Sequence, residues 1–141
     1  MSDCVFCSIA ADRAPAYRVA EDERTLAFLD VNPAARGHTL VVPKEHAESI
    51  TEMRASLVGD VFQTAQRVAA ALESAFEPDG INVVQSNGRA AGQEVFHAHV
   101  HVIPRYEGDT VDLGWAAGDP DDGVLTDTAA TLRAESGAPS R

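Results

Sequence analysis

Three of the five histidines occupy alternate positions of one short run, and this spacing constrains the fold more than any other feature. The run is His97-Ala-His99-Val-His101-Val. Because a β-strand projects successive side chains to opposite faces, the imidazoles would line one face of a sheet and the small apolar residues would enter the core. Imidazole has an unperturbed pKa of about 6.5, so near neutrality it can act as nucleophile, base or metal ligand. The sequence therefore predicts a strand over Val95 to Ile103 that carries the chemistry.

The residues of the row leave three interpretations open. Alternate histidines on a strand can bind one Zn²⁺ that activates a water molecule for hydrolysis. One imidazole can instead attack a substrate covalently while its neighbours orient it. The third interpretation is a wet sheet face on which the histidines are only hydrogen-bonded. The row contains no carboxylate of the kind that often accompanies histidines at a metal site.

Other segments predict the remaining elements of one α+β domain. Apolar residues repeat at helical spacing between Ser49 and Phe76, and Ser49 with Glu52 forms a capping-box signature at the start of this predicted helix. A short helix is predicted from about Val124 to Glu135. Runs rich in β-forming residues, separated by Asp, Asn, Gly and Pro, predict five strands of one antiparallel sheet: Tyr17 to Ala20, Thr25 to Asp30, Thr39 to Pro43, Ile81 to Ser86 and Val95 to Ile103.

The row and its surroundings resemble the histidine triad (HIT) family of nucleotide hydrolases and transferases. Gly92-Gln93 precedes the row and Pro104-Arg105 follows it. Further similar segments are Thr25 to Asp30, Gly37 to His46, and Ser86-Asn87-Gly88. The resemblance implies the HIT-like fold, in which a five-stranded antiparallel sheet is joined by one long helix. It covers about residues 1–106, so that residues 107–141 are expected to be an acidic, partly ordered extension.

The resemblance also implies a reaction. His99 would attack the α-phosphorus of a nucleoside 5′-phosphate derivative, and water would cleave the resulting nucleotidyl-histidine. His97, His101 and His38 would support His99. Dinucleoside polyphosphates and nucleoside phosphoramidates are the leading substrate classes, with a purine nucleotide as the bound group. Two alternatives are a nucleotide-binding module that does not turn over and a zinc-dependent hydrolase that uses the row directly.

Several residues are implied to hold the nucleotide. Phe28 would contact the base and Asp30 the ribose hydroxyls, although from the residues alone Phe28 suits a core position and Asp30 a turn. Glu94 stands where some family branches have Ser or Thr, and strand alternation would turn its carboxylate away from the histidine face. The residues expected near the phosphate are Ser86, Asn87, Gln93, Glu94 and Val95.

Cys4-Val-Phe-Cys7 is a second chemical signal. Two cysteines supply half of the four ligands that zinc needs. Resemblance to zinc-containing prokaryotic HIT proteins completes the set with His46 and His97, which would make a closed structural Cys₂His₂ site. Two reduced thiols in a cytosolic core are the alternative.

The charged residues of the chain limit the kinds of ligand that it can bind. The 22 acidic and 11 basic residues give a net charge of −11, which disfavours nucleic acid polymers as ligands. Either a salt-adapted source or an ordinary acidic sequence explains this charge. We expect a cytoplasmic protein, because we find no charged-then-apolar leader and no run of about 18 apolar residues that could span a membrane. The family resemblance implies a homodimer, to which part of the long helix could contribute.

Overall fold

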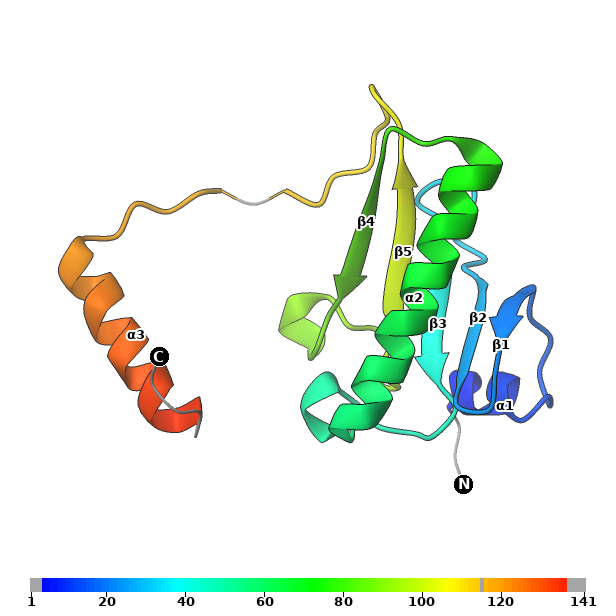
Figure 1. Cartoon of the computed structure of the whole chain (residues 1–141), viewed down its shortest axis with the longest axis horizontal. Helices are drawn as coiled ribbons and strands as arrows, with labels where there is room; N and C mark the ends of the chain where they lie inside the picture. The colour runs from blue at the N-terminus through cyan, green and yellow to red at the C-terminus, as the bar shows by residue number, and fades with distance from the viewer. Residues whose placement is uncertain (1–3, 115, 137–141) are drawn as a thin grey trace. The chain divides into compact units, whose positions relative to one another are not determined.

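The computed structural model describes residues 4–114 and 116–136. Two compact units divide the chain, Met1–Val111 and Asp112–Arg141. The first contains a five-stranded sheet in the order β1-β2-β3-β5-β4 (Figure 1), with every neighbouring pair antiparallel. The predicted five-stranded antiparallel α+β fold is confirmed. Its strands are β1 (Arg18–Glu21), β2 (Thr25–Leu29), β3 (Thr39–Pro43), β4 (Gly80–Gln85) and β5 (Val100–Arg105).

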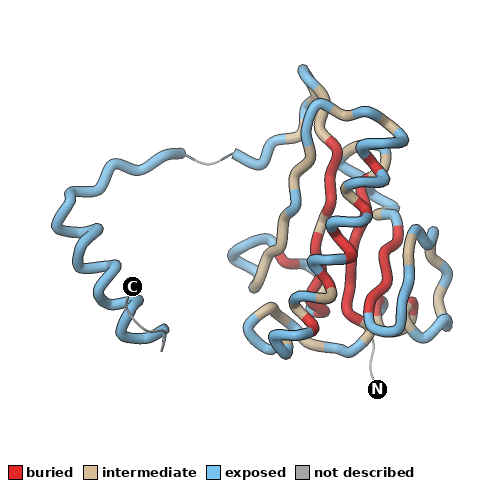
Figure 2. Tube along the Cα trace, viewed as in Figure 1, coloured by how far each residue is buried: buried red, intermediate tan, exposed pale blue. Residues whose placement is uncertain are grey.

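The long helix α2 (Ala55–Phe76) covers one face of this sheet. Figure 2 shows the buried residues along the central strands and along the side of the helix that faces them. The core on this face consists of Ala27, Val41, Val61, Ala65, Val68, Leu72, Val100 and Val102. Val100 and Val102 therefore enter the core as the alternation predicted, which places the side chains of His99 and His101 on the opposite face.

The short helix α1 (Val5–Ala10) packs against that opposite face. Its residues Phe6 and Ile9 are buried against alternate side chains of β2 and β3, which are Leu26, Phe28, Leu40 and Val42. Sequence analysis predicted no helix here. Cys4 caps it, because the Cys4 Sγ accepts a hydrogen bond from the backbone N–H of Cys7 at 3.3 Å.

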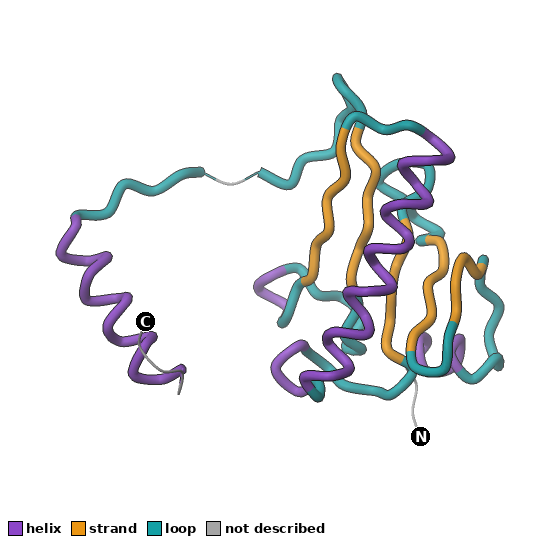
Figure 3. The backbone as a smooth tube through the Cα atoms, in the orientation of Figure 1, coloured by secondary structure: helices purple, strands orange, loops and turns teal. Residues whose placement is uncertain are grey.

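The predicted strand over Val95 to Ile103 is wrong in extent. Residues 95–97 form a bend, drawn as loop in Figure 3, and β5 begins only at Val100. Pro43, at the end of β3, has no N–H with which to extend the ladder. The Ala98 N–H instead donates to the Ala47 carbonyl at 2.7 Å. This bend separates the surroundings of His97 from those of His99.

The predicted capping box is also wrong. Residues Ile50–Glu52 form a single 3₁₀ turn (η1), and α2 begins at Ala55 after Arg54. Glu52 accepts from the Glu48 N–H, while the Ile50 N–H donates to Asn87 Oδ1 at 2.7 Å. A side chain 37 residues away in sequence thus binds the amide of Ile50.

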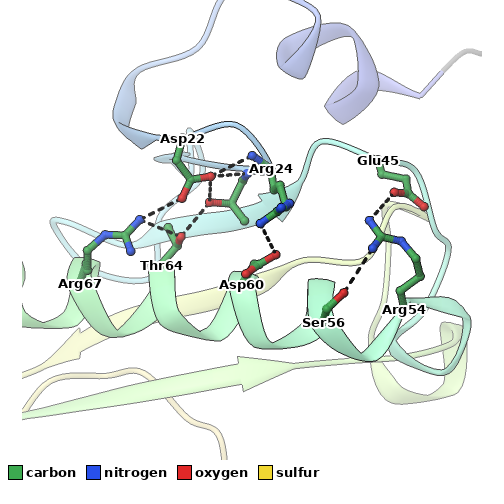
Figure 4. Close-up of polar contacts among 9 residues, drawn as sticks. Asp22, Arg24, Glu45, Arg54, Ser56, Asp60, Thr64 and Arg67 are labelled. Atoms are coloured by element: carbon green, nitrogen blue, oxygen red, sulfur yellow. Dashed lines mark hydrogen bonds and ion pairs between the residues drawn. The ribbon is translucent and has the colours of Figure 1, made fainter.

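Polar contacts join the β1–β2 turn to α2 (Figure 4). The Asp22 carboxylate accepts from the backbone N–H groups of Arg24 and Thr25 and from the Arg67 guanidinium. These bonds, the Arg24 amide first, hold the pKa of Asp22 below its usual value. Beneath them the hydroxyls of Thr25 and Thr64 form a buried hydrogen bond of 2.7 Å. The turn is therefore fixed against the helix by paired polar groups.

Gly37 and Gly59 make a matched pair for a stability test. Gly37 has φ +96°, and a Cβ there would lie 2.8 Å from Leu72 Cδ2, so Gly37→Ala is expected to destabilise the fold by about 2 to 4 kcal/mol. Gly59 lies inside α2 with nothing within 4 Å of an added Cβ, so Gly59→Ala should stabilise by about 0.5 to 1 kcal/mol. Urea unfolding of both variants checks the signs, and equal shifts would contradict this account.

The second unit contains α3 (Asp122–Ser136). The short C-terminal helix is confirmed, although it begins two residues before the predicted start, with Asp122 inside its first turn. Every residue described in α3 is exposed. Across residues 4–114 and 116–136, no helix is both long and apolar enough to cross a bilayer.

Candidate functional site

A cavity of about 520 Å³ opens on the face of the sheet that α1 partly covers. His99 and His101 lie in its wall at the β5 side, and Phe28 and Asp30 lie at the β2 side. Phe6, Ile9 and Leu40 make its wall largely apolar. A cavity of this size and lining, with a few convergent polar groups, is typical of a small-molecule site.

One hydrogen bond fixes the tautomer of His99. Its Nδ1 lies 2.7 Å from the backbone carbonyl oxygen of His97. Because a carbonyl oxygen can only accept, the proton of neutral His99 is on Nδ1, and Nε2 carries a lone pair. His99 is 8% exposed, and the edge contact of its ring with Phe6, at 5.2 Å between centroids, restricts rotation of the ring. His99 is thus a held imidazole with a nucleophilic nitrogen.

His38 and His101 form a second hydrogen-bonded pair. The backbone N–H of Ala34 donates to His38 Nδ1 at 2.9 Å, so a neutral His38 carries its proton on Nε2. This Nε2 lies 2.9 Å from His101 Nδ1 and donates to it. Neutral His101 is consequently protonated on Nε2. The His101 ring lies 5.0 Å from that of His99, centroid to centroid, and offers an N–H donor beside the His99 ring.

Burial keeps this pair neutral. Burial, followed by the neighbouring imidazoles of His99 and His38, lowers the pKa of His101 to about 4. Burial also lowers the pKa of His38, against the opposing effect of the Asp30 carboxylate. At neutral pH both rings therefore act as neutral hydrogen-bonding groups rather than as cations.

The lowered pKa of His101 predicts a loss of stability in acid. The pKa is about 4 in the folded protein and about 6.5 when unfolded, so between these values the unfolded chain binds more protons. The stabilisation is complete above pH 6.5, declines as the pH falls towards 4, and declines no further below that. We expect His101 to account for about 2 to 3 kcal/mol. Urea midpoints at pH 7 and 4.5 measure the decline, and His101→Asn should show a smaller one; parallel declines would refute the assignment.

A cluster of Cys4, Cys7, His46 and His97 lies beside this site. The buried His97 Nε2 donates to the Pro43 carbonyl at 2.7 Å, so its Nδ1 carries a lone pair directed into the cluster. Burial lowers the pKa of His97, which favours this neutral form. All four potential ligand atoms lie within 4.8 Å of one another.

The spacing of these atoms fits a tetrahedral zinc site. Zinc bond lengths of about 2.3 Å to sulfur and about 2.0 to 2.1 Å to nitrogen require N···N edges of about 3.3 Å and S···N edges of about 3.6 Å. The two Nδ1 atoms, of His46 and His97, are 3.2 Å apart. The measured Sγ···Nδ1 distances are 3.3, 3.3 and 3.5 Å. The donor set and its size therefore fit zinc.

Comparison with known proteins identifies the family. The sequence model described as "HIT domain" matches residues 11–108. The chain belongs to the HIT family. It is 45% identical to "Protein hit" of Bacillus subtilis over 114 residues, which are 80% of this chain and 79% of that protein. It is 38% identical to "Adenylylsulfatase HINT3" of Arabidopsis thaliana over 116 residues, 82% of this chain and 57% of that protein.

Solved structures of HIT proteins match this chain over most of its length. A HIT family member from B. subtilis has a TM-score of 0.91 at 39% identity, covering 99% of this chain and 100% of its own. A histidine triad nucleotide-binding protein from Candida albicans has a TM-score of 0.86 at 31% identity, with 94% and 96% covered. A Zn-bound histidine triad protein from Mycobacterium smegmatis has a TM-score of 0.75 at 39% identity, also with 94% and 96% covered.

The HIT cavity gathers only some of the predicted nucleotide-binding residues. Phe28 lines it and also packs in the core beneath α1, while its contact with a base stays a prediction. Asp30 lines it too, with Oδ2 at 3.6 Å from His38 Nε2. Glu94 and Val95 are in its wall. The alternation argument does not apply to Glu94, because residue 94 precedes β5, and this exposed residue is among those that line the cavity.

The other predicted residues lie apart from this wall. Asn87 and Gln93 line a separate cavity of about 310 Å³, and Ser86 follows the end of β4. The buried Gln93 accepts from the Gly88 N–H and donates to the carbonyls of Glu48 and Val95. The side chains of Asn87 and Gln93 thus bind backbone groups of the segments around residues 48–50 and 88–95.

Sequence reasoning missed Phe6. Its ring edge contacts both His97 and His99, with centroids 5.9 and 5.2 Å apart, and so it links the cysteine cluster to the cavity. The available signal was an aromatic residue between two cysteines, which would point inward if the cysteines bound a common partner.

Proposed function

We propose that this HIT protein hydrolyses nucleoside 5′-phosphate derivatives by transferring the nucleotidyl group to His99 and then to water. The observation that carries the proposal is the bond from His99 Nδ1 to the His97 carbonyl oxygen, which leaves Nε2 with a lone pair in a ligand-sized cavity. The adenylylsulfatase of A. thaliana, at 38% identity, supports an adenylyl derivative as substrate.

The two steps use the groups already described. The His99 Nε2–phosphorus bond forms while the bond to the leaving group breaks, and the leaving group takes a proton from solvent. The His97 carbonyl then stabilises the imidazolium through Nδ1–H, and His101 Nε2–H donates a hydrogen bond at the reacting phosphate. Water next attacks phosphorus, the phosphorus–Nε2 bond breaks, and the proton of that water returns to solvent. The sum is addition of one water across the cleaved bond.

The walls of the cavity support a nucleotide as the transferred group. Phe28 and the apolar residues around it would receive the base, and Asp30 would accept hydrogen bonds from ribose hydroxyls. The structure from C. albicans, whose name describes it as nucleotide-binding, supports this assignment. The roles of Ser86, Asn87 and Gln93 near the phosphate remain predictions. Because these residues lie outside the cavity wall, we propose that they act indirectly, through the backbone beside the phosphate.

Zinc is proposed as a structural ion held by Cys4, Cys7, His46 and His97. A closed four-ligand site has no open position for a catalytic water, so the ion would supply stability rather than chemistry. The Zn-bound HIT structure from M. smegmatis supports this proposal. The direct zinc-hydrolase alternative is disfavoured because the three row histidines point to different partners.

The homodimer and the cytoplasmic location belong to the same proposal. β4 is an edge strand of the sheet, with Val83 47% exposed on it, and an edge strand offers unpaired backbone groups to a second subunit. Sedimentation equilibrium distinguishes the dimer from a monomer.

The decisive experiment follows AMP release from adenosine 5′-phosphoramidate and from diadenosine polyphosphate, with and without a chelator. A nucleotidyl adduct that is labile in acid and stable in alkali, trapped with ³²P at the α-position, would establish the histidine intermediate. AMP release that stops on chelation of a still-folded protein would instead establish metal hydrolysis. Nucleotide binding without AMP from either substrate would establish the binding module and overturn the proposal.

A further inference from the structure

The charges in the cavity wall are all of one sign. Within the part of the chain that the structure describes, Asp30 and Glu94 are the only Asp, Glu, Lys or Arg side chains that line the cavity. His101 in this wall and its hydrogen-bonded partner His38 are neutral at pH 7, because burial lowers their pKa values. A bound polyanion would meet two carboxylates and no fixed cation.

The backbone fixes the location of Glu94. The buried side chain of Gln93 donates a hydrogen bond to the Glu48 carbonyl at 2.7 Å. The backbone N–H of Gln93 donates to the Gly88 carbonyl at 3.1 Å. Gln93 Nε2 also binds the Val95 carbonyl at 3.0 Å. With both neighbours anchored, Glu94 is held at the cavity wall beside Gly92 and Val95.

The two carboxylates differ in what surrounds them. Asp30 accepts from the Asn32 N–H at 2.8 Å and lies near His38, directly after β2, where the nucleoside is proposed to bind. Glu94 is exposed, and among the described residues no hydrogen bond or ion pair holds its carboxylate. Glu94 is on the segment that leads into the histidine row. From this segment its charge would act on the part of a substrate that lies beyond the reacting phosphorus.

Resting on the proposed function, we propose that Glu94 selects substrates by the charge of the leaving group, favouring nucleoside phosphoramidates of neutral or cationic amines over dinucleoside polyphosphates. A departing polyphosphate carries several negative charges and is normally matched by Arg, Lys or Mg²⁺. An amine that bears a second ammonium group is attracted by Glu94. The α-phosphate has the same charge in both substrate classes and does not discriminate between them.

The test uses two adenosine phosphoramidates of nearly equal size. One is formed with 1,2-diaminoethane, which leaves an ammonium group at its far end, and the other with glycine, which leaves a carboxylate. The quantity compared is the ratio of their kcat/KM values in each protein, because differences in amine basicity cancel between proteins. Glu94→Gln should lower the ammonium-to-carboxylate ratio by about tenfold at low salt, and Glu94→Lys should lower it further. High salt should shrink the effect.

Glu73→Gln is the matched control, because Glu73 is an exposed carboxylate of α2 that does not line the cavity. A Glu94→Gln ratio that stays within twofold of the wild type would overturn the charge selection. Equal shifts in the Glu94→Gln and Glu73→Gln proteins would also overturn it, by assigning the effect to net charge. Failure of the wild type to release AMP from either amidate would refute the proposed function itself. This outcome differs from AMP release with an unchanged ratio, which would refute only the role of Glu94.

Discussion

His99→Ala is expected to lower AMP release by at least about 10⁴-fold, since it removes the atom that forms the covalent bond. Nucleotide binding should change by less than about threefold, because the apolar wall and Asp30 remain. The imidazole packs edge-on against Phe6 on the surface of the cavity, so the fold should survive its loss. Quenched-flow measurement of AMP, with calorimetric titration of AMP binding, checks both parts.

His101→Ala is the comparison that separates the two roles. Loss of a hydrogen-bond donor beside the reacting group is expected to cost about 10² in kcat, and the covalent adduct should still form slowly. If His99→Ala retained a tenth of the activity, or if the two variants were equally impaired with no adduct in either, His99 would not be the nucleophile.

The second large effect is expected from the cysteine cluster. Cys4→Ala and Cys7→Ala should each abolish zinc binding and lower the Tm by about 10 °C or more. A structural metal binds the folded state and not the unfolded state, so its loss removes stability from the fold. The cluster joins Cys7 to His46, 39 positions away, and Cys4 to His97, 93 positions away. Loss of the cluster should therefore release α1 from the sheet. Atomic emission should find one zinc per wild-type chain, and differential scanning calorimetry should detect the fall.

Ser8→Ala is the control for this effect, since Ser8 is a half-buried residue of the same helix outside the cluster. It should keep its zinc and most of its Tm. Below the lowered Tm, the cysteine variants should retain measurable AMP release. If they kept the wild-type Tm, zinc would not stabilise the fold; if they lost all activity while folded, zinc would take part in the reaction.

The sequence predicted those parts of the site that follow from short-range periodicity. The alternation at His99 to Val102 placed the imidazoles and valines on opposite faces, because strand geometry depends on adjacent residues. The five strands followed in the same way. What could not be predicted depends on contacts between distant segments. Nothing near Ser49 indicates that Asn87 would bind the Ile50 amide, and nothing near Gln93 indicates that its side chain would bind the Glu48 carbonyl.

Glu94 illustrates how the path of a loop changes a conclusion about function, here whether a carboxylate lies at the cavity. Its parity in a continuous strand turns the carboxylate away from the histidines, and the parity argument fails only because the segment bends before Val100. The four-ligand cluster was predicted from family resemblance, since two cysteines alone do not specify the other ligands. The site therefore combines locally readable chemistry with loop geometry that depends on long-range hydrogen bonds.

The tautomers of His99 and of the His38–His101 pair are set by main-chain atoms, the His97 carbonyl and the Ala34 amide. A survey that truncates side chains one at a time would register nothing at position 34, where the native residue is already alanine. Only replacement of the peptide N–H, by proline or by an ester linkage, would reveal that this amide places the His38 proton on Nε2, where it donates a hydrogen bond to His101. Part of what sets the proton positions in this cavity is thus invisible to side-chain mutagenesis.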